Sequence, residues 1–229
     1  MPNHSTTYQL IDIYHRILLA LEQKQHTALV FCDFSKAFDR VWHKGLLLKL
    51  EKYGINGKLL LWIKNYLTNR KQCVRITNLI SNENSIKAGV PQGSVLGPLL
   101  FLLYINDIAS SLLSVCSLYA DDTSLLFSST NVLEIEQTLN EDLKVLDNWS
   151  KKWLMSFNPK KTNIMIISNI ILPYTPTFYL NNIQIPIVKE HKHLWVILSA
   201  DAKWNNHINT LSKNVNKYIS TLRKFKYQL

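Results

Sequence analysis

Three aspartates occupy positions where a carboxylate could do chemistry. Asp33 follows an apolar run, and Asp121 stands directly beside Asp122 between two further apolar runs. Like charges so close together repel, so this arrangement is costly unless cations neutralise it. Carboxylate oxygens suit Mg²⁺, which binds through one or two carboxylates and substrate phosphates. Two such ions, about 3.5–4 Å apart, would activate an attacking 3′ hydroxyl and stabilise a leaving pyrophosphate, and this reaction is nucleotidyl transfer.

Each acidic position also has an ordinary structural interpretation. Two adjacent aspartates in a tight turn can be turn chemistry alone, because aspartate tolerates a left-handed backbone. An acid after a strand, such as Asp33, is often only a helix cap. Neither position is specific by itself, so the motifs elsewhere in the chain have to decide between the interpretations.

Three short motifs follow one another along the chain. They are residues 31–39 (FCDFSKAFD) with 41–43 (VWH), residues 89–98 (GVPQGSVLGP) and residues 119–122 (YADD). In this order they resemble motifs A, B and C of the reverse transcriptases of non-LTR (LINE-like, jockey-like) retrotransposons. Weaker similarities agree with that family, and they lie at residues 3–6 (NHST), 104–107 (YIND), 158–162 (NPKKT, resembling motif D) and 204–208 (WNNHI).

The resemblance implies a polymerase site that binds two Mg²⁺ ions, for which Mn²⁺ could substitute. Asp33, Asp121 and Asp122 would be the catalytic and metal-binding acids, and the backbone of Phe34 would supply a further ligand. Lys161 would act as the general acid for the departing pyrophosphate. A lysine before a strand is also often only solvated, so that alternative stays open.

The resemblance also implies contacts with the incoming nucleotide. The ring of Phe38 would lie beneath the sugar, where a 2′-hydroxyl would strike it, so deoxynucleotides would be preferred. Phe34 and Gln92 would contact the nucleotide, and Gly93 would let the backbone approach the primer and template. Phe38 could equally be a core residue, and the glycines around Pro91 could simply form a turn between a strand and a helix.

Composition favours a polyanionic partner. The 229 residues carry 26 Lys and Arg against 16 Asp and Glu, for a net charge of +10 and a pI near 9.4. Charge alone does not separate nucleic acid from an acidic membrane surface or from a plain basic protein. The resemblance implies an RNA template, a DNA primer and a deoxynucleoside triphosphate as partners, and it leaves the oligomeric state open.

Several other classes of protein are disfavoured. Three scattered cysteines indicate neither a disulfide framework nor a zinc ribbon. The most apolar stretch, residues 95–105, is shorter than the ~20 residues that a membrane helix needs. The first ten residues lack the features of a secretory signal. We therefore expect no membrane association and an intracellular protein, in the nucleus or the cytoplasm.

Periodicity predicts how the chain positions these motifs. Apolar residues at spacings of three and four predict helices, and short apolar runs bounded by turns predict strands. Helices are expected over 7–23, 44–53, 58–67, 94–108, 133–154 and 207–225. Strands are expected over 28–32 and 163–168, in a hairpin over 71–88 with its tip at 81–84, in a hairpin of 112–118 with 123–128 around the acidic turn, and in short pieces over 178–198.

This alternation of helices with an antiparallel sheet argues for an α+β fold. The resemblance implies a right-hand polymerase palm, an antiparallel sheet with packed helices, over residues 1–170 together with residual fingers elements. A primer-grip and partial thumb-like region would follow over residues 171–229. The basic last helix would track the minor groove of a hybrid duplex there, although a solvated helix face explains its lysines equally well.

The sequence departs from the family in two ways. It begins almost at residues 3–6, so the fingers segment that usually precedes them is expected to be truncated, and Trp195 stands where relatives tend to have glycine and would crowd the primer grip. Two hypotheses follow: an RNA-directed DNA polymerase, or an inactive nucleic-acid-binding remnant of such an element. A viral RNA-dependent polymerase is disfavoured by Phe38 and by Ala120, where such enzymes usually have glycine.

Overall fold

A four-stranded antiparallel sheet lies at the centre of the chain. The computed structural model describes residues 5–226, so the beginning of the NHST motif lies outside the described residues. The strand order is β6 (Val115–Tyr119), β7 (Asp122–Ser129), β1 (His26–Cys32) and β8 (Asn163–Ile167). Every residue of β1 is buried, as its apolar run predicts for a central strand.

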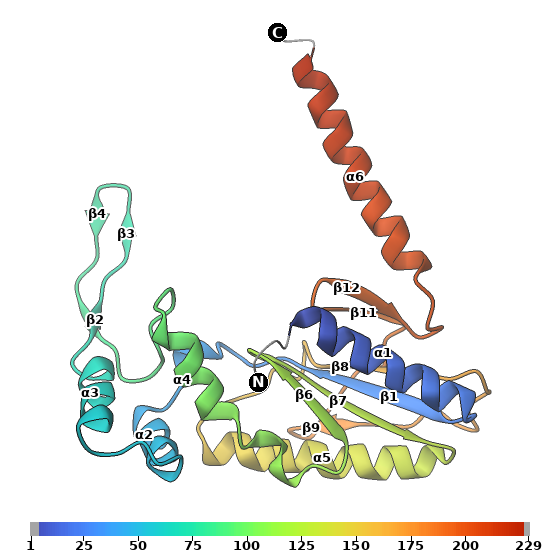
Figure 1. Cartoon of the computed structure of the whole chain (residues 1–229), viewed down its shortest axis with the longest axis horizontal. Coiled ribbons are helices and arrows are strands. Elements are labelled where there is room, and N and C mark those ends of the chain that lie inside the picture. The colour runs from blue at the N-terminus through green and yellow to red at the C-terminus, as the bar shows by residue number, and fades with distance from the viewer. Residues whose placement is uncertain (1–4, 227–229) are drawn as a thin grey trace.

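One face of this sheet packs against helices. Successive side chains of a strand point to opposite faces, and Ala28, Val30 and Cys32 belong to the larger hydrophobic core. This core lies between the sheet, α5 (Val132–Lys152) and α4 (Leu96–Ile105) (Figure 1). The helix predicted over 94–108 is thus three residues shorter at its end than expected, and a short 3₁₀ turn follows it.

The other face has a smaller core. Leu29 and Phe31 point into it, and α1 (Thr6–Glu22) covers it together with the hairpin of β11 (Glu190–His193) and β12 (Val196–Ser199). Figure 1 shows α1 and this hairpin on the side of the sheet opposite α5. The sheet therefore has both faces covered, which accounts for the apolar character of β1 on both sides.

The first helix matches its prediction in extent but not in its whole apolar stripe. The hydroxyl of Ser5 caps α1 by accepting a backbone N–H three residues on, at 3.4 Å. Ile13 and Ile17 are buried, whereas Ile11 and Leu18 are 58% and 40% exposed. The predicted stripe was therefore too wide, because only a narrow strip of the helix touches the sheet.

Two short helices and a projecting hairpin follow β1. The helices are α2 (His43–Lys52) and α3 (Gly57–Leu67), close to the predicted bounds, and Gly54 between them has φ +85°. The hairpin is an interrupted pair of β2 (Lys71–Gln72) with β5 (Asn84–Ser85) and β3 (Arg75–Ile76) with β4 (Leu79–Ile80).

The predicted tip of this hairpin was wrong. Ile76 pairs with Leu79, so the chain turns at Thr77 and Asn78 rather than at 81–84. Thr77 takes φ +53°, a left-handed value that is uncommon for a β-branched residue. A polar run such as 81–84 is typical of a turn. Here the two-residue turn a few positions earlier lets the exposed strands β3 and β4 pair.

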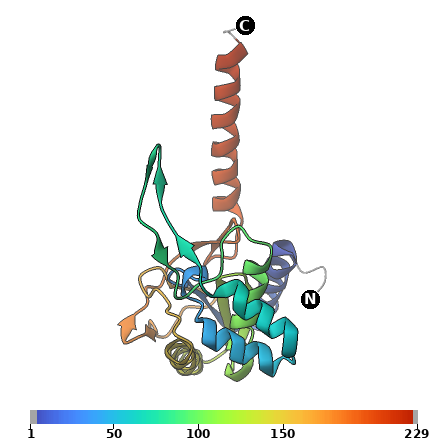
Figure 2. The same ribbon diagram turned by 90° about the vertical axis from the view of Figure 1, so that its left-hand side faces the viewer.

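The remaining elements are a short hairpin and the last helix. The hairpin consists of β9 (Tyr179–Leu180) and β10 (Ile183–Gln184), and the helix is α6 (Asn205–Lys226). In both views α6 and the β2–β5 hairpin project from the same side of the body (Figures 1 and 2). The apolar stripe of α6 is exposed along its length. None of the helices in residues 5–226 is long and apolar enough to cross a membrane.

Candidate active site

The acidic turn joins β6 to β7. Tyr119 pairs with Asp122, so Ala120 and Asp121 form a two-residue turn and Asp122 is the first residue of β7. Ala120 has φ +51°, a left-handed value that two-residue hairpin turns require. The turn places both carboxylates at the end of the hairpin, exposed to solvent.

Strand register brings Asp33 to the same place. Cys32 is paired with Thr123 across β1 and β7, so Asp33 and Asp122 are the next residues of the two strands. Burial raises the pKa of Asp122, and the charges of Asp121 and Asp33 raise it further. The three acids are thus close enough to affect one another electrostatically, although they are far apart in the sequence.

The segment that resembles motif D is hydrogen-bonded to the backbone of Asp33. The N–H of Asn158 donates to the carbonyl of Asp33 at 2.8 Å, and the hydroxyl of Thr162 donates to the carbonyl of Asn158 at 3.0 Å. Nζ of Lys161 lies 3.7 Å from Oδ2 of Asp33, and this lysine side chain is 68% exposed. Lys161 is therefore solvated, and its ammonium group also lies near Asp33. Its role as a general acid stays a prediction.

The carboxylates suit a Mg²⁺ ion that also takes oxygens from a bound phosphate. Oδ2 of Asp33 is buried and accepts no hydrogen bond from the described residues, and its ion pair with Lys161 at 3.7 Å is loose enough to leave it available to a metal ion. Within residues 5–226, no three His, Cys, Asp or Glu side chains surround one possible ion position. Mg²⁺ keeps several waters and often binds through only one or two protein carboxylates. The donor set therefore fits an ion whose remaining ligands are water and substrate.

Two neighbouring cavities surround the acids. One, of about 160 Å³, is lined by Asp33, Asp122 and Lys161. The other, of about 330 Å³, is lined by Asp121 and again by Asp122. Lys192, on β11, lines both cavities. The β11–β12 hairpin therefore forms a wall of the site, and no motif or spacing in the sequence points to Lys192 as part of it.

Two histidines of this hairpin lie beside the acids, with His193 buried and His191 half-buried. The ring of His191 stacks on Phe31 with centroids 3.9 Å apart, and both His191 and His193 line the cavity that contains Asp33. Burial lowers the pKa of His193 to about 4, helped by the nearby His191, and burial also lowers the pKa of His191. Both rings are therefore neutral near pH 7, so they add no positive charge to the site.

The turn of this hairpin contains the tryptophan that departs from the family. His193 pairs with Val196, so Leu194 and Trp195 form the turn, with φ +48° and +72°. Trp195 is 82% exposed, and Nζ of Lys192 lies 4.2 Å from the centre of its ring. The turn lines the cavity beside Asp121. A bulky side chain therefore occupies a left-handed position where glycine would be unstrained.

This strain predicts a difference between two truncations of the same side chain. Trp195→Gly should be more stable than Trp195→Ala by about 1 kcal/mol, because both lose the same contacts and only glycine adopts the left-handed turn freely. Urea denaturation of the two variants measures the difference. Equal stability would mean that the turn relaxes to a negative φ.

The loop that resembles motif B is attached to the segment after Asp33. The N–H of Gly89 donates to the carbonyl of Val41 and the N–H of Val90 donates to that of Phe38, both at 2.8 Å. The ring of His43 donates from Nε2 to the carbonyl of Gly89 at 2.7 Å. These bonds fix the loop against the motif that contains Asp33.

Gly89 permits this close approach, and we expect its replacement to be costly. It has φ +93°, and a Cβ there would lie 2.9 Å from Cα and from the carbonyl oxygen of Asp39. Gly93 has φ +78° but open space around it. Gly93→Ala should therefore cost about 1 kcal/mol of backbone strain. Gly89→Ala should cost about 1–2 kcal/mol more, because a clash with backbone adds to the strain.

Thermal and urea denaturation of the two glycine variants test this expectation. A Gly89→Ala protein as stable as Gly93→Ala would contradict the close approach of the loop to Asp39.

Four residues are predicted to contact the nucleotide, and among the described residues that line the two cavities none of them appears: Phe34, Phe38, Gln92 and Gly93. The ring of Phe34 is buried and stacks on the ring of Phe157, with centroids 4.4 Å apart. The backbone hydrogen bonds of the bridge between these two residues are made by the residues on either side of them, so the bridge does not use the Phe34 carbonyl. Phe38 is half-buried. Gln92 is exposed, and Gly93 has no contacts around it that a side chain would disturb.

Two of these residues have protein partners of their own. The ring of Phe38 stacks on Phe101 with centroids 4.6 Å apart, so it is partly a core residue. Nε2 of Gln92 donates to Oδ1 of Asp39 at 3.0 Å. A nucleotide contact by Gln92 would therefore have to replace or share that hydrogen bond.

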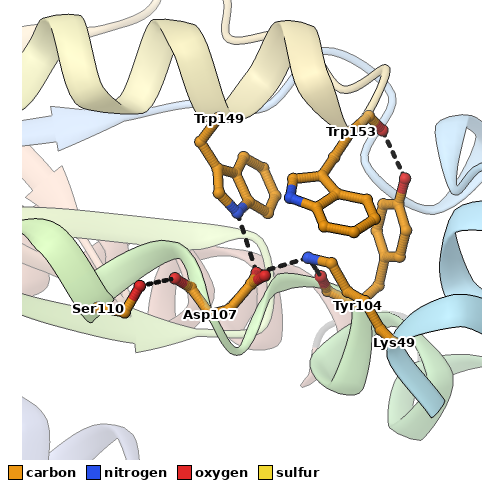
Figure 3. A network of polar contacts seen from close by, with 6 residues as sticks. All are labelled: Lys49, Tyr104, Asp107, Ser110, Trp149 and Trp153. Carbon is orange, nitrogen blue, oxygen red and sulfur yellow. Dashed lines mark hydrogen bonds and ion pairs between the residues drawn. The ribbon is translucent and has the colours of Figure 1, made fainter. Parts of the chain in front are cut away.

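A buried lysine lies on the face of the sheet that α4 and α5 cover, opposite the β11–β12 hairpin. The ammonium group of Lys49, on α2, donates to the carbonyl of Tyr104 and to Oδ1 of Asp107, and it lies 3.8 Å from the ring centre of Trp153 (Figure 3). Nε1 of Trp149 donates to the same oxygen of Asp107 at 2.9 Å. Burial lowers the pKa of Lys49 to about 8, although Asp107 opposes the shift.

This Lys49 network fixes the end of α5. The hydroxyl of Tyr104 donates to the carbonyl of Trp153, directly after that helix (Figure 3). Three residues on, the carbonyl of Ser156 accepts from the N–H of Ser35 at 2.8 Å, beside Asp33. The YIND motif had no assigned role in the sequence. Its tyrosine and aspartate join α2, α4 and α5 behind the acids.

Comparison with known proteins agrees with these motifs. The model of one family, described as reverse transcriptase (RNA-dependent DNA polymerase), matches residues 1–198. The chain is 33% identical over 235 residues to a probable RNA-directed DNA polymerase from transposon BS of Drosophila melanogaster. It is also 33% identical over 227 residues to the RNA-directed DNA polymerase from mobile element jockey of Drosophila funebris. Each alignment covers 96% of this chain and 25% of the relative, so the chain spans about a quarter of their length.

Solved structures share the fold at low sequence identity. Apo telomerase from Candida tropicalis superimposes with a TM-score of 0.58 and 12% identity, covering 86% of this chain and 39% of that one. Telomerase from Candida albicans gives a TM-score of 0.53 and 12% identity, covering 87% and 34%. The predicted α+β fold of the right-hand polymerase type is thereby confirmed.

Proposed function

Because the chain belongs to the reverse transcriptase (RNA-dependent DNA polymerase) family, with relatives in non-LTR retrotransposons, we propose that it extends a DNA primer on an RNA template. The observation that supports this proposal best is the convergence of Asp33, Asp121 and Asp122 from two separate motifs. A turn aspartate or a helix cap would not need an acid on the neighbouring strand, so the structural interpretations explain this convergence poorly.

The chain's own groups divide the work of nucleotidyl transfer. Asp33 and Asp121 would hold the cations, Asp122 would be the more peripheral acid, and the carbonyl of Phe34 would add a ligand. When bound, two Mg²⁺ ions, or Mn²⁺ in their place, would polarise the primer 3′ hydroxyl and the phosphates of the nucleotide. Lys161, which reaches Asp33, supplies a proton to the departing pyrophosphate.

The nucleotide lies between the acids and the loop attached to Asp39. Phe38 stacks on Phe101 and presents its remaining surface to the sugar, which disfavours a 2′-hydroxyl. Gln92 contacts the nucleotide by releasing Asp39, and Gly93 lets primer and template approach. The net charge of +10 favours the phosphates of all three partners.

Residues 1–170 form the palm with residual fingers elements in this proposal, and 171–229 form the primer grip and part of a thumb. The β11–β12 hairpin beside Asp121 and the projecting α6 support that division. A protein that copies RNA into DNA needs nucleic acid and nucleotides, so we place it in the nucleus or the cytoplasm.

Primer extension on poly(rA)/oligo(dT) tests the proposal. Incorporation of dTTP should require Mg²⁺, be lost on chelation and be lost in Asp121→Ala. Binding of the hybrid without magnesium-dependent incorporation would overturn the enzymatic proposal for this chain, and it would favour a nucleic-acid-binding remnant.

A further inference from the structure

We propose that α3 presents a stacking platform for the bases of single-stranded nucleic acid. The platform consists of Trp62, Tyr66 and Arg70, and we call it the α3 column. Trp62 and Tyr66 lie on α3 and Arg70 follows it, whereas the acids lie at the ends of strands, and the column lines neither cavity around them. This inference deepens the proposed function and rests on it for the identity of the strand, which would be the unpaired part of the template.

The three side chains are stacked in order. Trp62 and Tyr66 are four residues apart on the helix, with ring centroids 6.0 Å apart and planes inclined by only 16°. The guanidinium carbon of Arg70 lies 5.4 Å from the centre of the Tyr66 ring. Trp62 is 53% exposed, so much of its indole surface is open to solvent. A base stacked on the indole would extend a column that the protein has already ordered.

Only the Tyr66 end of the column reaches the hydrophobic core, where the half-buried ring packs against it, and Trp62 projects outward. The residues of α3 that are buried are Ile63 and Leu67, which lie on another side of the helix. A tryptophan that is 53% exposed at the end of such a column is a poor use of apolar area for stability alone, because about half of its surface stays in water. Exposed aromatic groups of this kind are common at binding surfaces.

The surrounding charge identifies a polyanion as the occupant. Residues 52–82 contain no Asp or Glu and six basic residues, all of them exposed: Lys52, Lys58, Lys64, Arg70, Lys71 and Arg75. Lys71 forms an ion pair with Glu83 at 3.0 Å, and both side chains are more than half exposed. Aromatic rings among basic side chains are the surface that sequence-tolerant single-strand binding proteins use.

Single strands fit the column better than duplexes do. The faces of bases inside a duplex are already stacked and are therefore hidden from a side chain. Phosphate contacts by the six basic residues would serve either form, so base stacking by Trp62 is the contact that distinguishes them. A protein segment with an apolar face is the competing occupant, and it would not be sensitive to salt in the same way.

Fluorescence anisotropy with a labelled single strand of about 16 nucleotides tests the column. Both uridine RNA and thymidine DNA strands are used, beside a duplex of the same length. Trp62→Ala should weaken single-strand binding by about tenfold, which is the value of one base stacked on an aromatic ring. Trp62→Phe should restore most of the affinity, because phenylalanine retains a ring for stacking.

Leu61→Ala is the matched control, since Leu61 is 56% exposed on the same helix but outside the column. Leu61→Ala should leave the affinities for single strands and for the duplex unchanged. Trp62→Ala should leave the affinity for the duplex unchanged. Equal single-strand affinity of Trp62→Ala and Leu61→Ala would overturn the proposal. So would an equal loss for single strand and duplex, or a Trp62-dependent self-association, which would indicate a protein occupant.

These outcomes are independent of catalysis. The binding measurement is made without Mg²⁺, so failure of primer extension would leave the column standing, and failure of the column would leave primer extension standing. If the RNA strand binds more tightly than the DNA strand in the parent protein but not in Trp62→Ala, the column contributes to template choice.

Discussion

Asp33→Asn should reduce magnesium-dependent primer extension by about a thousandfold, because the loss of a metal-binding carboxylate removes several kcal/mol of charge stabilisation. The substitution keeps the shape of the side chain and removes the oxygen charge that no protein group neutralises by a hydrogen bond. Steady-state incorporation of dTTP, at saturating hybrid, measures the loss.

The effect on stability separates catalysis from folding. Asp33 is one of the charges that raise the pKa of Asp122, so its removal should let that pKa fall towards the ordinary value. The ion pair with the exposed Lys161 contributes little, so the folded state should then be about as stable as before. Asp12→Asn, which breaks an exposed ion pair with Arg16, is the control and should keep its activity. A large loss of stability in Asp33→Asn would show that the acid supports the fold instead.

The largest effect on stability is expected from Asp107→Ala. The variant leaves the ammonium group of Lys49 buried with its aromatic neighbours and one carbonyl but no counter-charge. Removing one partner of a buried pair costs about 3–5 kcal/mol, and because the Asp107 side chain is 38% exposed we expect the lower end of that range. For a domain of this size the melting temperature should fall by roughly 10 °C. Urea and thermal denaturation at pH 7 measure both quantities.

The pH dependence of the same variant has a definite sign. Burial lowers the pKa of Lys49 to about 8, so the folded state favours the neutral amine more than the unfolded state does. Without Asp107, which opposes that shift, the pKa of Lys49 lies lower still, so the penalty begins to fall below pH 8 and disappears as the pH rises to the ordinary pKa of 10.5. Asp107→Ala should regain stability over that window, and more steeply than the parent protein.

Two further variants bracket this expectation. The double variant Lys49→Met with Asp107→Ala should be more stable than Asp107→Ala alone, because an apolar side chain leaves no unpaired charge. Glu83→Ala breaks an exposed pair and should cost at most about 1 kcal/mol. If Asp107→Ala and Glu83→Ala cost the same, the Lys49 network does not bear on stability.

Most of the fold follows from local patterns in the sequence. The helices and the central strand have strong periodicity or a continuous apolar run, and their bounds agree with prediction to within a few residues. The tip of the β2–β5 hairpin was misplaced because its strands are exposed on both faces and carry no alternation. Its register is set by a few short backbone pairings, and nothing nearby in the sequence encodes them.

The site was predictable in part for a similar reason. The acids lie at the ends of strands, and strands that pair in register bring their ends together, so Asp33 and Asp122 meet as the motifs imply. Lys49 had no such signal. It has the pattern of a surface lysine on an amphipathic helix, and its burial depends on two tryptophans about 100 residues further along the chain.

The attachment of α6 gives the molecule a lever. Its base is held by Asn206, which donates to Glu190 on β11 at 2.6 Å, and by Trp204, whose ring lies 4.7 Å from that of Tyr14. From this base 22 residues extend away from the body, a length of about 33 Å. Tilting the base by about 5° moves the far end by about 3 Å, nearly the rise of one base pair. A small rotation of the β11–β12 hairpin beside Asp121 would thus displace the far end of α6 by about one nucleotide step.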